Sequence, residues 1–362
     1  MMKQQHGANI FELARHYGFS EDQILDFSSN INPLGPSPKA LSALRDNLNL
    51  CTTYPDPEYT DLKAAIRKYS HYSGPVLLGA GTTELFHSYI QALHPKHGAI
   101  LEPCYSEYAR ELTMAGATVH RYFLHEEEHY ALNMDDFLTF VTQESIDTVI
   151  FANPNNPTGT LVSPTALEAL LQTGCHVLID ETYIEFTDVN TTSAIPLLAR
   201  YDNLFITRST SKFFATPGIR LGYGLTANTE LYHALDSATM LWNINIYAAF
   251  LATHMFADTA YHDAVYAHIK KERTLALKNL ADITQLTCYP SFGNFILCKI
   301  ENERTAKDLR DALLQNAVVI RDCADFKGLT PYHFRFCVLH AEQNAALIRH
   351  ISAFFKNSIS IL

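Results

Sequence analysis

Short apolar runs alternate with amphipathic segments through the first 256 residues, a pattern typical of α/β proteins. The apolar runs predict buried strands at 99–101, 118–124, 148–152, 176–179, 204–206 and 221–225. The amphipathic segments predict helices at 38–48, 59–72, 82–93, 164–172 and 229–241, with more helix to about residue 256. Polar residues follow several of these strands directly, at the sheet edge where α/β proteins bind ligands.

The chain beyond residue 256 is organised differently. A long charged segment, 261–282, predicts a helix that links two lobes. After it, strands are predicted at 295–300, 318–321 and 334–339, and helices at 305–315 and 342–355. The first 39 residues predict an arm with a short helix, 10–17, and a strand, 25–27. We therefore expect a large domain over 40–255 and a small α+β domain formed by 1–39 and 256–362.

Composition narrows the class of protein. A chain of 362 residues is long enough for two lobes with separate cores. No apolar stretch approaches bilayer length and the first residues contain no apolar signal-peptide core, so we expect a cytoplasmic protein without membrane contact. A net charge of −11 without a compensating Lys/Arg run disfavours nucleic-acid binding. The seven cysteines are scattered and form no C-x-x-C pair, which indicates reduced thiols.

Three short strings match motifs of other protein classes but lack the surroundings those classes need. HEEEH at 125–129 matches the H-E-x-x-H zinc motif, yet it is very acidic and follows a strand, so we expect an exposed loop without a metal. Ser209-x-x-Lys212 matches the nucleophile motif of penicillin-binding enzymes, but S-D-N and K-T-G do not occur. Gly79-x-Gly81 lacks the third glycine and a clear strand-helix-strand context of a dinucleotide site.

The segment 207–224, TRSTSKFFATPGIRLGYG, carries the most concentrated chemistry in the chain. Lys212 precedes two phenylalanines, and an ammonium held beside aromatic rings has a lowered pKa, as a Schiff-base lysine requires. Ser209 and Arg220 are suited to binding a phosphate. This spacing resembles the lysine loop of fold-type I pyridoxal phosphate (PLP) enzymes. The plainer alternative is a surface lysine on an ordinary loop.

Polar residues at other strand ends extend this pattern. Asp180 ends the strand 176–179, where a carboxylate is costly unless it is paired. Asn156 follows the strand 148–152 within a proline-spaced segment. The glycines at 79 and 81 open a helix whose exposed amides favour an anion, although a plain capped helix start explains them equally well.

PLP chemistry requires a lysine, an acid for the pyridine nitrogen, donors for the phenolate oxygen and the phosphate, and an aromatic ring beside the cofactor. The chain offers these groups in order along the sequence. We expect Lys212, Asp180 and Tyr183 to be catalytic. The expected cofactor-binding residues are Tyr54, Gly81, Thr82, Thr83, Tyr105, Asn156, Asp180, Tyr183, Ser209, Ser211, Lys212 and Arg220.

The resemblance covers nearly the whole chain. NPNNPTG at 153–159, DETY at 180–183 and the lysine loop resemble the histidinol-phosphate aminotransferase family. HGAN at 6–9, the segment 25–36 and the segment 319–329 are more similar to the threonine-phosphate decarboxylase family. The resemblance implies a fold-type I α/β protein with a mostly parallel seven-stranded sheet. It also implies a homodimer in which Tyr54 reaches the cofactor phosphate of the neighbouring subunit.

The resemblance further implies a small phosphorylated amino acid as substrate. The implied substrate-binding residues are His6, Gly7, Asn30, Asn156, Arg321 and Arg335. The chain departs from the pattern at two positions, since Ala8 stands where a second glycine is expected and Thr182 where an alanine is expected.

The expected reaction is decarboxylation of O-phospho-L-threonine to (R)-1-aminopropan-2-yl phosphate for cobalamin biosynthesis. The alternatives are a histidinol-phosphate aminotransferase, an O-phosphoserine decarboxylase and a PLP-fold regulatory protein without turnover. The bond that breaks must stand perpendicular to the cofactor ring, so a decarboxylase turns the substrate carboxylate out of that plane and an aminotransferase keeps it in the plane. Arg321 and Arg335 are suited to either arrangement.

Overall fold

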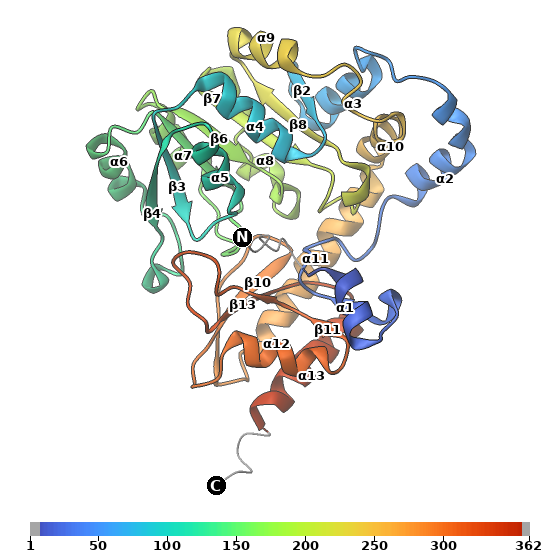
Figure 1. Ribbon diagram of the computed structural model, residues 1–362, viewed down its shortest axis with the longest axis vertical. Helices are drawn as coiled ribbons and strands as arrows, with labels where there is room; N and C mark the ends of the chain where they lie inside the picture. Colours follow the sequence, from blue (N-terminus) through green and yellow to red (C-terminus); the bar gives the residue numbers. More distant parts are fainter. Residues whose placement is uncertain (1–7, 357–362) are drawn as a thin grey trace.

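The computed structural model describes residues 8–356 and is built around a seven-stranded mixed sheet (Figure 1). Its strand order is β2-β8-β7-β6-β5-β3-β4, and all neighbours are parallel except β8, which runs antiparallel to both β2 and β7. The strands are β2 (Val76–Gly79), β3 (His97–Glu102), β4 (Thr118–Phe123), β5 (Thr148–Ala152), β6 (His176–Asp180), β7 (Leu204–Ser209) and β8 (Gly222–Thr226).

Both faces of this sheet are covered, because the strands are apolar on both sides. Ile150 and Ala152 of β5 belong to one buried cluster, while Val149 and Phe151 belong to another. Successive side chains of a strand point to opposite faces, so the two clusters lie on opposite sides of the sheet. The covering helices are α2 (Pro38–Asp46), α3 (Thr60–Ser70), α4 (Thr82–Leu93), α5 (Glu107–Met114), α6 (Met134–Gln143), α7 (Pro164–Leu171), α8 (Val189–Thr192), α9 (Thr229–Ala238) and α10 (Ile246–Ala257).

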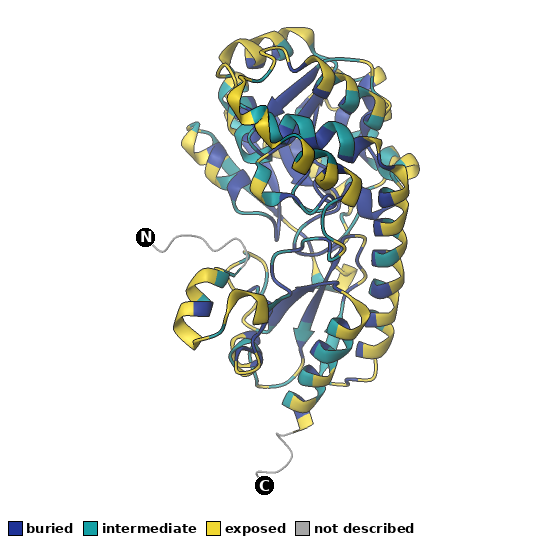
Figure 2. Ribbon diagram, turned by 90° about the vertical axis from the view of Figure 1, so that its right-hand side faces the viewer, coloured by how far each residue is buried: buried dark blue, intermediate teal, exposed yellow. Residues whose placement is uncertain are grey.

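The long helix α11 (Thr259–Leu280) runs from this part of the molecule to a second, smaller sheet, with its outer side exposed (Figure 2). The smaller sheet has the order β12-β13-β10-β9 and is antiparallel throughout. Its strands are β9 (Leu286–Cys288), β10 (Phe295–Ile300), β12 (Arg321–Asp322) and β13 (His333–Cys337), accompanied by α12 (Ala306–Leu314) and α13 (Ala341–Lys356).

The N-terminal arm joins this smaller part of the molecule. After α1 (Ile10–Tyr17), β1 (Leu25–Asp26) pairs in parallel with β11 (Val318–Val319). The prediction of one strand over 318–321 is therefore wrong. The chain leaves its pairing with β1 after Val319 and begins a new pairing with β13 at Arg321.

The predicted α/β fold with a mostly parallel seven-stranded sheet is confirmed. The helix over 10–17 and the strands over 148–152 and 295–300 have the predicted bounds. The elements β2, β9, α5, α6 and the short α8 were not predicted from the sequence, and β2 is the strand that precedes Gly81. The division into domains at residues 40 and 256 stays a prediction. Within residues 8–356, no helix is both long and apolar enough to cross a bilayer.

Candidate functional site

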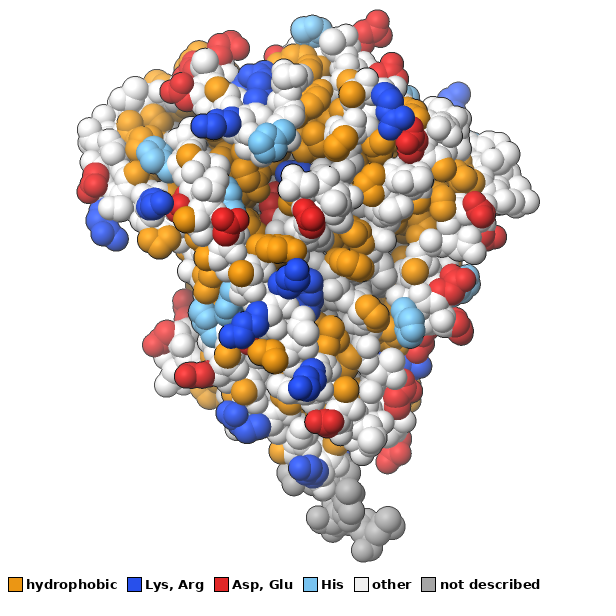
Figure 3. All heavy atoms as spheres, turned by 180° about the vertical axis from the view of Figure 1, so that it is seen from behind, with side chains coloured by type: hydrophobic (Ala, Val, Ile, Leu, Met, Phe, Trp, Pro, Cys, Tyr) orange, Lys and Arg blue, Asp and Glu red, His pale blue; other side chains and the backbone are white. Residues whose placement is uncertain are grey.

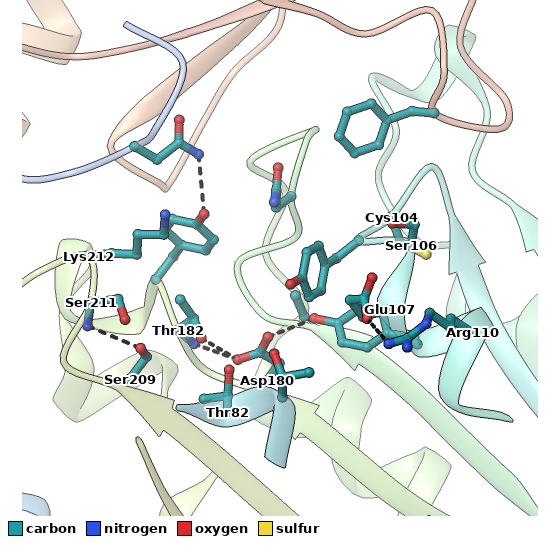
Figure 4. Close-up of a pocket in the computed structure, with 18 of the residues that line it drawn as sticks. Thr82, Cys104, Ser106, Glu107, Arg110, Asp180, Thr182, Ser209, Ser211 and Lys212 are labelled. Atoms are coloured by element: carbon teal, nitrogen blue, oxygen red, sulfur yellow. Dashed lines mark hydrogen bonds and ion pairs between the residues drawn. The ribbon is translucent and has the colours of Figure 1, made fainter. Parts of the chain in front are cut away.

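A cavity of about 1260 Å³ opens at the carboxyl ends of the parallel strands, facing the smaller sheet (Figure 4). Its walls come from segments that are far apart in the sequence. The large sheet contributes residues after β2, β3, β5, β6 and β7, and the smaller sheet contributes residues of β12, β13 and the loop between them. This is the edge at which α/β sheets bind ligands.

Lys212 projects into this cavity from the loop after β7. Its Nζ donates a hydrogen bond to the carbonyl oxygen of Ser29 at 2.6 Å. The backbone of the loop is held from the arm, because Asn32 N donates to the carbonyl oxygen of Lys212 and Asn32 Nδ2 to that of Phe213. Burial, and after it the positive charge of Arg335, lowers the pKa of Lys212 to about 8. A fraction of the amine is therefore neutral and nucleophilic near neutral pH.

Asp180 ends β6 and is held rigidly at the cavity floor. Its Oδ1 accepts hydrogen bonds from the backbone N and the Oγ1 of Thr182, at 3.0 and 2.6 Å. Its Oδ2 accepts one from the hydroxyl of Tyr108 at 2.7 Å. Burial raises the pKa of Asp180, while the hydrogen bonds from Thr182 and Tyr108 favour its ionised form. The result is an oriented carboxylate at the site where a cation would be stabilised.

Three hydrogen bonds connect the arm, the large sheet and the small sheet across the cavity. Asn30 Nδ2 donates to the hydroxyl of Tyr183 at 3.2 Å. Arg335 donates to Asn156 Oδ1 through Nη1 and to the carbonyl oxygen of Ser28 at 2.8 Å through Nη2. The buried Asn30 Oδ1 and Arg335 Nε have no partner within the described chain, so each is an unused polar group in the wall of the cavity.

The start of α4 and the end of the lysine loop form one side of the cavity. Gly81, with φ +93°, precedes the first residues of α4, Thr82 and Thr83, and all three line the cavity. Arg220 reaches across from the loop before β8 and donates to the carbonyl oxygen of Ala80 at 3.1 Å. A side chain at Gly81 would collide with this guanidinium, so the close approach requires glycine.

Strand β8 keeps this side together. A Cβ at Gly222 would lie 2.8 Å from the backbone nitrogen of Thr82. Because Gly222 has no side chain, the start of α4 and the lysine loop can approach each other. Free helix amides, Ser209 and a guanidinium converge here, which is a suitable donor set for a phosphate.

Tyr105 and Ser211 also line the cavity. The ring of Tyr105 lies edge-on to that of Tyr108, with centroids 5.6 Å apart. Burial raises the pKa of Tyr105 to about 12, so its hydroxyl stays protonated at neutral pH. Tyr105 thus presents a neutral aromatic side chain beside the acid at position 180.

Two predicted groups of residues lie elsewhere. His6 and Gly7 lie outside the described residues, so their roles stay predictions. Tyr54 is 74% exposed and stacks on Trp242 with ring centroids 4.3 Å apart, away from the cavity of its own chain. Its expected contact with a partner subunit stays a prediction. The HEEEH segment forms a mostly exposed turn, in which Glu126 pairs with Lys299 at 2.7 Å.

The sequence analysis missed several residues that shape the site. Tyr108 had no role, because α5 was not predicted, yet its hydroxyl orients Asp180. The pair Glu181 and Arg208 was also missed. Arg208 is 1% exposed, and its Nε donates to Glu181 Oε2 at 2.9 Å. This buried ion pair ties the end of β6 to the end of β7 directly behind the cavity. The signal in the sequence was a glutamate directly after one apolar strand and an arginine near the end of the next.

The donor set matches the chemistry of PLP point by point. The amine of Lys212 would form the covalent link, Asp180 would stabilise the protonated pyridine nitrogen, and Tyr105 would lie beside the ring. Asn156 and Tyr183 would hold the phenolate oxygen. The phosphate would be bound by Gly81, Thr82, Thr83, Ser209, Ser211 and Arg220. Within residues 8–356, no cluster of three or more His, Cys, Asp or Glu side chains is arranged to hold a metal.

Comparison with known proteins gives the class. The family model for aminotransferase class I and II matches residues 22–351. The chain therefore belongs to the class I and II aminotransferase family and is a PLP-dependent enzyme, as predicted.

The relatives include both a threonine-phosphate decarboxylase and a histidinol-phosphate aminotransferase. The chain is 33% identical over 350 residues to the threonine-phosphate decarboxylase of Salmonella typhimurium, with 95% of this chain and 94% of that protein covered. It is 32% identical to the histidinol-phosphate aminotransferase of Clostridium acetobutylicum, whose crystal structure superimposes with a TM-score of 0.87, covering 92% and 100% of the two chains.

The fold is also shared with a solved PLP complex. The histidinol-phosphate aminotransferase of Sinorhizobium meliloti, crystallised with pyridoxal-5'-phosphate, has a TM-score of 0.85 at 21% identity and covers 97% of this chain and 95% of that one. Because similar identities link this chain to a decarboxylase and to an aminotransferase, the reaction must be inferred from the site.

Proposed function

We propose that this protein decarboxylates O-phospho-L-threonine to (R)-1-aminopropan-2-yl phosphate, a step that supplies cobalamin biosynthesis. The observation that carries the proposal is the pair of arginines in the cavity wall opposite Lys212. Arg335 and Arg321 are directly opposed on the antiparallel strands β13 and β12, and both line the cavity. A substrate with a carboxylate and a phosphate matches two guanidinium groups.

The charge around the cavity supports an anionic substrate. Arg335 is 4% exposed, and no carboxylate within residues 8–356 forms an ion pair with it. A buried charge without a counter-ion is unfavourable, so an anion from the substrate would stabilise this guanidinium. Although the chain carries a net charge of −11, Lys and Arg side chains lie together across the middle of one face (Figure 3). O-phospho-L-threonine carries both anionic groups in one molecule, whereas an aminotransferase must accept histidinol phosphate, which contains a phosphate but no carboxylate, as well as a keto acid with two carboxylates.

The chain's own residues supply the remaining requirements of the reaction. PLP, when bound, provides an electron sink for the negative charge that develops on the substrate Cα. Asp180 holds its carboxylate toward that cofactor, fixed by Tyr108 and Thr182. Loss of CO2 leaves Cα in need of one proton, and the amine of Lys212 is suited to deliver it because its pKa is near 8.

We also propose a homodimer with Tyr54 at the partner's cofactor phosphate. Two separate segments, 48–54 and 240–242, carry large exposed apolar side chains, and the stacking of Tyr54 on Trp242 brings the two segments together. Exposed apolar groups of this size are typical of protein interfaces. The exposed residues are Leu48, Tyr54, Met240, Leu241 and Trp242.

The test is product analysis of the PLP-loaded protein with O-phospho-L-threonine, with and without 2-oxoglutarate. We expect CO2 and aminopropanol phosphate in equal amounts, independent of the keto acid. Absence of CO2 from fully loaded protein would refute the proposal.

Histidinol-phosphate aminotransferase activity is the second candidate, favoured by the 32% identity to the Clostridium acetobutylicum enzyme. It predicts turnover of histidinol phosphate that depends strictly on 2-oxoglutarate. Parallel reactions with O-phospho-L-serine, which lacks one methyl group, measure how strongly the site prefers the threonine substrate. A difference of one such group contributes about 1–3 kcal/mol of selectivity in a binding pocket.

A further inference from the structure

The two cavity arginines have very different surroundings. They are cross-strand partners, and like charges directly opposite each other on a sheet are destabilising. Arg335 is buried and is held by neutral acceptors, Asn156 Oδ1 and the carbonyl oxygen of Ser28. Arg321 instead forms an ion pair with a carboxylate of this chain. Its Nη2 donates to both carboxylate oxygens of Asp325, at 2.9 and 2.7 Å.

Asp325 lies where an incoming anion would bind. Like Arg321, it lines the cavity, and its side chain is 54% exposed, whereas that of Arg321 is 15% exposed. The other contacts of Arg321 leave its position fixed, because Nη1 donates to the carbonyl oxygen of Asp322 at 2.7 Å and the guanidinium lies 5.1 Å from the ring centre of Phe326. The carboxylate of Asp325 is therefore the more exposed partner of a cation that has other contacts.

We propose that Asp325 is a displaceable internal counter-ion, which neutralises Arg321 in the empty site and yields it to the phosphate of the substrate. The proposal rests on the proposed function in one respect, since it takes a phosphorylated substrate for this site. A half-exposed ion pair is weak, and a phosphate dianion offers more charge and more acceptor oxygens than one carboxylate. Asp325 thereby sets the affinity of the site and prevents repulsion between the two arginines before substrate arrives.

The size of the effect follows from competition. If the Arg321–Asp325 pair has the stability of an exposed ion pair, removing the carboxylate increases the affinity for phosphate about 1.4- to 5-fold. The exchange concerns binding of the phosphate group alone. KM for the phosphorylated substrate should therefore fall by the same factor while kcat changes by less than about twofold.

The experiment compares PLP-loaded wild type with Asp325→Asn by calorimetric titration with inorganic phosphate at pH 8. The loaded protein is used so that the cofactor occupies the phosphate-binding side at Thr82 and Arg220. Asp322→Asn is the control, because it removes the same charge from the end of β12, while the side chain of Asp322 contacts Ala324 N and Arg310 and makes no bond to the Arg321 guanidinium in the described structure. In the background of Arg321→Gln, the Asp325→Asn change should have no effect.

Tighter phosphate binding in Asp325→Asn, absent in Asp322→Asn and in the Arg321→Gln background, is the expected result. Unchanged or weaker binding in Asp325→Asn, or no phosphate binding by either protein, would overturn the proposal. The readout does not depend on turnover. If the wild type releases no CO2 yet Asp325→Asn still binds phosphate more tightly, the proposed reaction fails and the role of Asp325 stands.

Discussion

The lowered pKa of Lys212 has a consequence that can be measured before any substrate is added. The neutral amine is the form that reacts with an aldehyde, so the rate at which the cofactor-free protein captures PLP should follow the deprotonation of Lys212. With a pKa of about 8, this rate should reach half of its maximum at about pH 8 and level off above about pH 9. A lysine with its ordinary pKa would give a rate that is still rising at pH 10.

The expected magnitude follows from the two pKa values. At pH 8 about half of a group with a pKa of about 8 is neutral, whereas about 0.3% is neutral at the reference pKa of 10.5. The neutral fraction is thus about 150-fold larger in the folded protein. Burial is the main cause, and the positive charge of Arg335 is the next.

The assay is stopped-flow absorbance of PLP mixed with the cofactor-free protein between about pH 6.5 and pH 10.5. In Arg335→Gln the nearby positive charge is gone, so the plateau should move to higher pH and capture at pH 7.5 should slow several-fold. Arg110→Gln is the control, because Arg110 also lines the cavity but its charge is paired with Glu107 and Glu111. A wild-type profile without a plateau below pH 10, or an Arg335→Gln profile identical to wild type, would refute this account of the amine.

Two further substitutions test the supports of the site. Gly81→Ala should weaken PLP binding about tenfold, since the new methyl group displaces Arg220 and the residue must keep a positive φ. In the control Gly218→Ala, a Cβ meets nothing within 4 Å, so this variant should bind PLP as wild type does. Equal affinities of Gly81→Ala and wild type in a fluorescence titration would contradict the role of Gly81 and Arg220 in phosphate binding. Arg208→Met leaves Glu181 buried without its partner and should lower the free energy of unfolding by about 3–5 kcal/mol in urea denaturation, whereas Arg200→Met, which breaks an exposed pair with Glu168, should cost less than about 1 kcal/mol. A loss below about 1 kcal/mol in Arg208→Met would show that the buried pair contributes little.

The cofactor side of the site was largely predictable from the sequence. Lys212, Asp180 and Asn156 each follow an apolar strand, and parallel strands end at the same sheet edge, so their convergence follows from the pattern itself. The start of α4 was harder to interpret, because the preceding strand, β2, is only four residues long and was not recognised. The residue types alone left a phosphate cradle and a capped helix equally plausible.

Residues whose position depends on tertiary contacts were not predictable from local pattern. Asn30 lies in a turn-forming stretch, and its bond to Tyr183 spans 153 positions of the sequence. Tyr108 lies on α5, whose apolar face was not distinguished from a loop, so its contact with Asp180 was missed. The break between β11 and β12 arises because two different strands, β1 and β13, compete for neighbouring residues. Where one strand ends and the next begins is therefore decided by pairing strands that lie far away in the sequence.

The two sheets divide the work of this molecule between them. Lys212, Asp180 and the residues that we propose to bind the cofactor phosphate lie at strand ends of the seven-stranded sheet, while Arg321 and Arg335 belong to the four-stranded one. We expect substitutions at Arg321 to change substrate choice while leaving Lys212 and Asp180 in place, whereas substitutions at Arg335 also act on the amine of Lys212. Relatives with different reactions can then diverge from a common ancestor while keeping the same overall likeness. We therefore expect chimeras that exchange only β12, β13 and the connecting loop to convert decarboxylase activity into aminotransferase activity, or the reverse.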